Sequence, residues 1–110
     1  MRVGIPVEEK KEDAKISSRF GRSPYFAIFD DEKNSVEFCD NPNISSDAHG
    51  KGPKTVQLLL DNKVDVIIAK ELGTNAKATV EAAGIKVYKA IDGTAKENFE
   101  KYKNNELSEL

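Results

Sequence analysis

Alternating apolar and polar positions at the start of the chain predict a β-strand. Apolar side chains occupy every second position of segment 2–7, and a period of two is typical of a strand. Segment 25–29 is apolar throughout, which favours an interior strand covered on both faces. A polar turn at 31–34 leads into another alternating segment, 35–40. Because the turn is short, we expect these two strands to form an antiparallel hairpin.

The pattern then changes to helices and strands in alternation. Segment 53–62 repeats its apolar residues at helical spacing and begins with a proline, which the first turn of a helix accepts. Segment 64–69 is a nearly continuous apolar run, typical of a buried parallel strand. An alanine-rich helix is expected over 74–83, ended by Gly84. Segment 85–90 is the last predicted strand.

A third helix is expected near the C-terminal end of the chain. Gly93 and Thr94 open it. Its apolar residues follow at spacings of four and then three, so they share one face that can pack on the sheet. The members of this core face are Ala95, Phe99 and Tyr102.

Two segments outside these elements carry no hydrophobic period. Residues 8–18 are polar and charged, and we expect a long exposed loop. Residues 104–110 are expected to form a frayed tail. The element order, βββαβαβα, predicts a single α/β domain over residues 1–110. Its mixed five-stranded sheet has helices packed on its faces.

The composition excludes several classes of protein. Hydrophobic residues make up 38% of the chain and charged residues 33%, as in soluble globular domains. The net charge of −2 and the pI near 5.5 provide no basic field for nucleic acid. The apolar stretch at the start of the chain is too short for a signal peptide, because polar residues follow it too early. No apolar run approaches the ~20 residues of a membrane span. A single cysteine allows no internal disulfide, so we expect a cytoplasmic protein that binds neither nucleic acid nor membrane.

The first candidate for chemistry is the segment that leads into the second strand, 18–26. Arg19 and Arg22 flank an aromatic residue and a glycine. The planar donor fork of arginine suits oxyanions and anionic clusters, and Gly21 permits a backbone turn. The alternative is a turn anchored by Phe20, with both arginines solvated or paired to surface carboxylates.

The second candidate holds the only cysteine and the only histidine, Cys39 and His49. Gly50 and Gly52 let the backbone approach a ligand, and the amides at the start of the following helix add a positive dipole. His49 can ligate a metal through a neutral imidazole. The alternative is a histidine that faces solvent or caps the helix. Cys39 falls on the strand face opposite the apolar residues, and a lone, partly exposed thiol is weak evidence for ligation.

The third candidate, segment 70–76, follows the fourth strand. Ligands of parallel sheets collect beyond the carboxyl ends of the strands, near helix N-termini. Thr74 or Asn75 is expected to cap the next helix, and Gly73 can let the chain pass close to an anion. The sequence contains no phosphate-binding fingerprint, paired-cysteine motif or nucleophile elbow.

Taken together, these segments resemble the dinitrogenase iron–molybdenum cofactor biosynthesis family, over nearly the whole chain and in the family's order. The most specific is the Phe-Gly-Arg segment. The segments that carry the resemblance are Ile5–Val7, Arg19–Phe26, the His49–Gly50 loop, Leu72–Ala76 and Ala83–Val87.

The resemblance implies a ribonuclease H-like α/β fold and a non-enzymatic role. This role is the binding or carriage of an iron–molybdenum cofactor or iron–sulfur cluster during metallocofactor assembly, with assembly or acceptor proteins as partners. The implied binding surface comprises Arg19, Phe20, Gly21, Arg22 and the loop around His49, and the glycines Gly50 and Gly73 complete the candidate set. His49 is the candidate metal ligand, and the absence of a cysteine cluster argues against a permanent four-thiolate centre.

Two other functions compete with this one. A ribonuclease H-like fold suggests metal-dependent nucleic-acid cleavage, but that chemistry needs converging carboxylates, and segment 2–7 carries none. A regulatory or protein-interaction module that binds a small anion at the same surface is the other alternative. Cluster uptake by the anaerobically purified protein discriminates it from a carrier.

Overall fold

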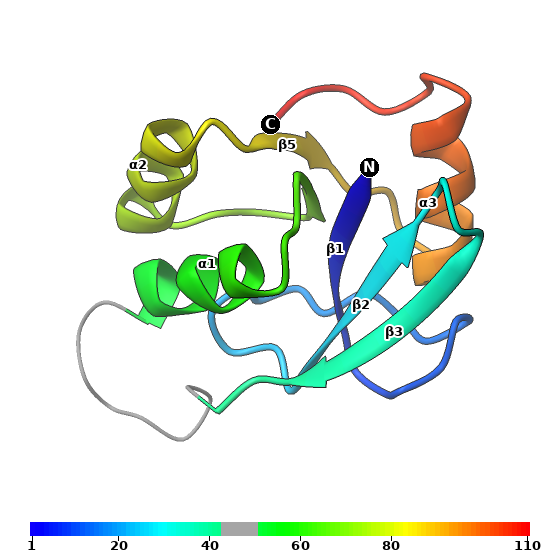
Figure 1. Ribbon diagram of the computed structural model, residues 1–110, viewed down its shortest axis with the longest axis horizontal. Coiled ribbons are helices and arrows are strands. Elements are labelled where there is room, and N and C mark those ends of the chain that lie inside the picture. The colour runs from blue at the N-terminus through cyan, green and yellow to red at the C-terminus, as the bar shows by residue number, and fades with distance from the viewer. Residues whose placement is uncertain (43–50) are drawn as a thin grey trace.

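The computed structural model describes residues 1–42 and 51–110, with the backbone alone for 51–53. Its strands belong to one five-stranded sheet in the order β3-β2-β1-β4-β5, and the predicted element order is confirmed (Figure 1). The strands are β1 (Arg2–Val7), β2 (Tyr25–Asp30), β3 (Ser35–Asp40), β4 (Val66–Ala69) and β5 (Lys86–Lys89). The helices are α1 (Lys51–Asp61), α2 (Thr74–Ala83) and α3 (Ala95–Lys103).

Strand direction determines where the connecting segments lie. β1 pairs antiparallel with β2, and β2 antiparallel with β3, whereas the β1–β4 and β4–β5 pairs are parallel. Only β2 therefore opposes the other four strands. The carboxyl ends of β1, β3, β4 and β5 lie beside the start of β2 at one end of the strands. We call this end of the sheet the carboxyl edge; it runs across all five strands and is distinct from the outer strands β3 and β5.

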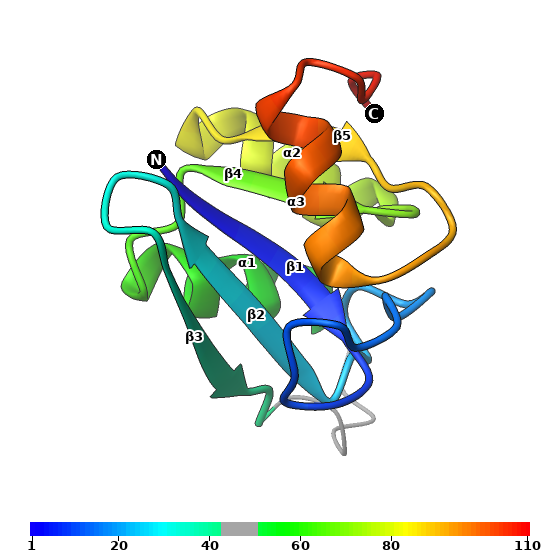
Figure 2. The ribbon, with the colours of Figure 1, turned by 90° about the vertical axis from the view of Figure 1, so that its right-hand side faces the viewer.

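The sheet separates two hydrophobic clusters. On one face, α3 contributes Ala95 and Phe99, and the ring of Phe99 stacks on Phe29 of β2 with 4.5 Å between centroids. On the other face, α1 and α2 pack side by side and contribute residues such as Val56 and Val80 (Figures 1 and 2). The helix positions confirm the prediction that the strand over 25–29 is covered on both sides.

β1 is the central strand, and two of its residues explain how it is accommodated. Pro6 lacks a backbone N–H, but the parallel pairing with β4 involves Val3 and Gly4, so Pro6 lies beyond it. Gly4 lies beneath α1 and the segment that follows it. A Cβ atom at this position would be 3.2 Å from a methyl group of Val64. Glycine therefore allows β1 to lie close to this layer.

The helix boundaries largely follow the sequence signals. α1 begins at Lys51, two residues before the prediction, which keeps Pro53 in its first turn. α2 ends at Gly84 with φ of 75°, as expected for a glycine stop. In α3, the hydroxyl oxygen of Thr94 accepts a hydrogen bond from the Glu97 amide at 3.2 Å. Thr94 is therefore a side-chain N-cap.

The prediction of a long exposed loop over 8–18 is partly wrong. Ala14 and Ile16 are buried in the α3-side cluster, and Ile16 forms a β-bridge with Val7. The backbone also pairs Lys15 with Thr94, directly before α3. These contacts connect residues distant in sequence, so no local hydrophobic period announces them.

The prediction of a frayed tail over 104–110 is wrong. Leu107 packs on the α3-side cluster. The Lys89 amide donates to the Ser108 carbonyl at 2.8 Å, and the Leu110 amide to the Val87 carbonyl at 2.9 Å. Backbone hydrogen bonds with β5 thus hold the tail against the edge of the sheet.

The described helices include none long and apolar enough to cross a membrane. The α/β class and the mixed sheet are as predicted, whereas the ribonuclease H-like assignment rests on the resemblance and stays a prediction.

Asn98 is the buried polar residue whose loss we expect to be costly. Its side-chain oxygen accepts a hydrogen bond from the Ile91 N–H at 2.8 Å. Its side-chain nitrogen donates to the carbonyls of Ile91 and Thr94, at 3.1 and 3.0 Å. Replacing it with alanine removes these three bonds. Of the three backbone groups, only the Thr94 carbonyl then keeps a partner among the described residues, the backbone N–H of residue 98 at 3.1 Å. We expect N98A to lower the free energy of unfolding by about 2 kcal/mol, as measured by urea denaturation. Asn104→Ala, at the exposed end of the same helix, should change it by less than about 0.5 kcal/mol. Equal effects of the two substitutions would contradict this role of Asn98.

Candidate functional site

The carboxyl edge collects the segments that hold the sequence-predicted site residues. Residues 8–24 connect β1 to β2 across this edge, 70–73 follow β4 and 90–94 follow β5. The segment after β3 also begins there, at Asn41. The topology thus brings the arginine segment, residues 18–26, and the start of α2 to the same edge.

The segment between β1 and β2 passes from one face of the sheet to the other. Ile16 is buried in the α3-side cluster, whereas Phe20 is buried in the cluster beneath α1 and α2. Phe20 is only 4% exposed, and its ring meets Phe26 of β2 edge to face at 5.4 Å. Phe20 therefore anchors the arginine segment from below and does not line an exposed surface.

Polar anchors hold the rest of this segment. The hydroxyl oxygen of the fully buried Ser23 lies 3.1 Å from the Val7 carbonyl and 2.7 Å from the Tyr25 carbonyl, so its single proton is shared between these two acceptors. The hydroxyl of Ser17 lies within hydrogen-bond distance of the Arg19 backbone, 3.4 Å from its amide nitrogen. The backbone between Ser17 and Tyr25 is therefore attached at several points.

Asn41 adds an anchor from a different strand connection. Its side-chain amide donates to the carbonyls of Gly21 and Ser23, at 3.3 and 2.9 Å, and its backbone N–H donates to Pro24 at 3.0 Å. Asn41 is buried. It therefore links the arginine segment to the start of the segment that carries His49.

Arg19 and Arg22 project into solvent from this anchored segment. Within residues 1–42 and 51–110, neither guanidinium makes an ion pair or a hydrogen bond. The remaining arginine, Arg2, contrasts with them, because its guanidinium lies 3.1 Å from Glu37 and 3.6 Å from Asp30. Among the described residues no carboxylate neutralises Arg19 or Arg22, so both exposed side chains present positive charge from a backbone that hydrogen bonds and Phe20 hold in place.

The start of α2 differs from the prediction. Its N-cap is Gly73, with no side-chain capping bond, so Thr74 and Asn75 are not the cap. Gly73 has φ of −66°, and a Cβ there would touch nothing, so neither strain nor crowding requires glycine. Because glycine has no side chain, no N-cap side chain accepts hydrogen bonds from the first-turn amides of α2. Uncapped amides at a helix start attract anions.

The positive charge of Lys70 is already neutralised. Its ammonium lies 2.9 Å from Asp92, and this hydrogen-bonded ammonium lowers the pKa of the Asp92 carboxyl. Lys70 and Asp92 follow neighbouring parallel strands, β4 and β5. Lys70 therefore differs from Arg19 and Arg22, for which the described residues offer no ion-pair partner.

Protein ligands for a metal are scarce in the described part of the chain. Residues 1–42 and 51–110 contain no group of three or more histidine, cysteine or acidic side chains arranged to hold an ion. Cys39 is half-buried and faces the α1 side, and burial raises the pKa of its thiol. The thiol is therefore protonated at neutral pH. His49 and Gly50 lie outside the described residues.

Sequence reasoning missed Asn41 and Ser23, because their role depends on carbonyl groups brought close by folding. Asn41 directly follows a strand and precedes a proline, which is the only local signal of a structural role. Chemically, the anchored segment, the two arginines and the open helix start suit the binding of an anion of low charge density.

Solved structures share this fold over almost the entire chain. A Thermotoga protein provisionally assigned as NifB is 42% identical, with a TM-score of 0.87, and the match covers 99% of this chain and 92% of that one. The apo orange protein of Desulfovibrio gigas is 24% identical with a TM-score of 0.93, over 99% and 92% of the two chains. A provisional dinitrogenase of Methanocaldococcus jannaschii is 23% identical with a TM-score of 0.69, over 100% and 94%. The last two likenesses establish the fold alone.

The sequence comparisons agree with the resemblance noted from the motifs. None of the curated proteins matches the chain. Residues 1–105 match the family described as dinitrogenase iron–molybdenum cofactor, and this range includes the whole carboxyl edge. The chain therefore belongs to the dinitrogenase iron–molybdenum cofactor family.

Proposed function

We propose that this protein binds an iron–molybdenum cofactor or an iron–sulfur cluster species at its carboxyl edge and carries it, without catalysis, to a protein of metallocofactor assembly. Family membership links the chain to this cofactor. The observation that carries the proposal is a pair of exposed arginines, without an ion pair to any residue that the structure describes, on a segment held by Phe20, Ser23 and Asn41.

The charge of the cargo matches the groups at this edge. A metal–sulfur cluster of net negative charge accepts hydrogen bonds at its sulfur atoms, and charge-assisted bonds from arginine are stronger than neutral ones. The anchored backbone is ordered before binding, so less conformational entropy is lost when the cargo arrives. The exposed amides at the start of α2 and Gly73 supply further positive potential.

Few direct bonds to the metal suit a carrier. His49 can supply one imidazole bond to a metal of the cluster, with Gly50 beside it allowing a close backbone approach. Cys39 belongs to no group of three or more metal-ligating side chains among the described residues, and its thiol is protonated. One coordinate bond and a set of arginine contacts can be given up to an acceptor that offers more ligands.

The nuclease alternative finds little support in the residues of the central strand. Two-metal cleavage of nucleic acid requires converging carboxylates, and β1 contains none between Arg2 and Val7. The carrier proposal therefore accounts better for the groups at the carboxyl edge.

Removing the arginine charges should weaken cargo uptake. We expect Arg19→Ala and Arg22→Ala each to lower the affinity about tenfold, because each loses a charge-assisted contact. The double variant should lose more. The measurement is an anaerobic titration with isolated iron–molybdenum cofactor, and separately with a synthetic [4Fe–4S] cluster, followed by visible absorbance after desalting.

Lys33→Ala is the matched control, because it removes one positive charge from the β2–β3 turn at the opposite edge of the sheet. Uptake by this variant should equal that of the wild type. If the arginine variants take up cargo normally, the assigned site is wrong. If the wild-type protein binds neither cluster but does bind simple oxyanions, the regulatory module replaces the carrier.

The histidine should affect the spectrum of the bound cargo as well as its affinity. If His49 bonds a metal directly, His49→Ala will shift the absorption bands of the bound cluster, since a metal ligand has changed. The arginine variants bind less cargo but should leave the band positions unchanged. Identical spectra for His49→Ala and the wild type at equal occupancy would exclude direct ligation by this residue.

Asn41 should influence uptake without any change of charge. Asn41→Ala removes the bonds to Gly21 and Ser23, and the loosened segment must then be ordered by the cargo. We expect about threefold weaker uptake, together with faster amide hydrogen exchange in residues 19–23. Asn104→Ala should change neither quantity. Faster exchange with unchanged affinity would show that the anchoring of this segment is irrelevant to binding.

A further inference from the structure

The outer edge of β5 is covered by only a few residues of the same chain. Residues 108–110 run antiparallel to β5, with a bridge between Tyr88 and Glu109. The backbone bonds at Lys89 and Val87, described above, complete this short ladder. β5 is the last strand of the sheet on that side. The chain thus demonstrates that this edge accepts an added extended strand.

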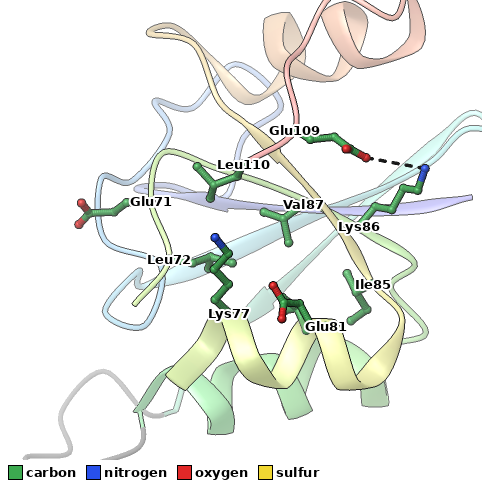
Figure 3. Close-up of a pocket in the computed structure, with 10 residues that line it drawn as sticks. Glu71, Leu72, Lys77, Glu81, Ile85, Lys86, Val87, Glu109 and Leu110 are labelled. Carbon is green, nitrogen blue, oxygen red and sulfur yellow. Dashed lines mark ion pairs between the residues drawn. The ribbon is translucent and has the colours of Figure 1, made fainter. Parts of the chain in front are cut away.

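A groove runs beside this ladder, between β5 and α2 (Figure 3). Its volume is ≈ 400 Å³, within the range of protein ligand sites. Lys77 and Glu81 rise from α2 toward Val87 and Leu110, as Figure 3 shows. The apolar side chains that line the groove are Leu72, Val80, Ile85, Val87 and Leu110.

The side chains of residues 108–110 add little to the backbone bonds that hold this segment on the edge. Leu110 remains 38% exposed although it lines the groove. Glu109 lies 3.7 Å from the ammonium of Lys86, and both side chains are well exposed, so solvent screens the pair. Leu107 is the one residue of 107–110 that packs on the hydrophobic core. The sheet itself does not depend on this segment, since β5 pairs with β4 over Lys86–Lys89.

We propose that the β5 edge and its groove bind an extended segment of a partner protein, which adds as an antiparallel strand in place of residues 107–110. The partner places an apolar side chain in the groove, where Leu110 lies, and an acidic side chain against Lys86. Addition of a strand to an open sheet edge is an established mode of peptide recognition, in which backbone bonds supply affinity and side-chain pockets supply selectivity. Residues 107–110 are then an internal ligand that the partner displaces.

The charge beside the β5 edge favours an acidic side chain on the partner. Lys86 loses Glu109 when the tail leaves. On the α2 side of the groove, Lys77 lies with Glu71 and Glu81, so that side adds no net positive charge. Glu71 and Leu72 directly follow β4, so a docked partner lies next to the carboxyl edge. This proposal holds whether or not a metal cluster is the cargo.

The test uses the full chain and a labelled peptide, acetyl-Asn-Glu-Leu-Ser-Glu-Leu, which repeats residues 105–110. The attached tail competes at an effective concentration in the millimolar range, so the wild-type chain should bind the peptide weakly by fluorescence anisotropy. Leu110→Pro removes the amide that donates to Val87 and should strengthen binding of the added peptide about tenfold. Glu109→Lys, which places two lysines together, is a second variant with the same expected direction.

Two controls test the register. A peptide with proline in place of its last leucine should lose binding to the Leu110→Pro chain. In the double variant Lys86→Glu and Leu110→Pro, the original peptide should bind about tenfold more weakly, and a peptide with its glutamates changed to lysine should restore affinity. Shifted amide signals should be confined to β5, α2, the groove residues 71–72 and the tail residues 104–110. Equal binding of a scrambled peptide, no gain in either tail variant, or signal changes elsewhere would overturn the proposal.

Discussion

The direction of the strands around β1 determines where this protein can act. β1 is buried on both faces, and burial of each of its valine and isoleucine side chains contributes about 1.5–3 kcal/mol. Its antiparallel pairing with β2 and parallel pairing with β4 then leave β2 as the one strand that opposes the rest. Because of this arrangement, four strands end at the same edge. The segments that follow them are brought together there, although they are far apart in the sequence.

The arginine segment shows how the core fixes a surface. Phe20 reaches the cluster beneath α1, while Ser23 and Asn41 satisfy carbonyl groups at the strand ends. None of these side chains needs to touch a ligand. Their effect is to hold the backbone that presents Arg19 and Arg22, so that positive charge is concentrated at a defined place in an otherwise slightly acidic protein. An anion that binds there meets donors that are already in position.

Helices and interior strands were predictable because their hydrophobic period is local. The β2 segment is apolar from Tyr25 to Phe29, and α3 places Ala95, Phe99 and Tyr102 at helical spacing. The structure confirms both elements. Ile16 and Leu107 were not recognised as packed residues, because each is a single apolar side chain among polar neighbours and its partners lie elsewhere in the chain. The same reason hid Asn41, whose hydrogen bonds are made to a different connection. The motif of the arginine segment was recognisable in the sequence. Only the fold shows that Phe20 is buried while Arg19 and Arg22 are exposed.

The most direct test of the central claim is an NMR titration of the protein with a metal–sulfur cluster, since it locates the contact without any substitution. A paramagnetic cluster broadens the amide signals near it. If the cargo binds at the carboxyl edge, broadening will be strongest for residues 19–23 and for the start of α2, whereas the β2–β3 turn over 31–34 and the opposite ends of the strands will keep sharp signals. Broadening centred on that turn, or spread evenly over the surface, would contradict the account.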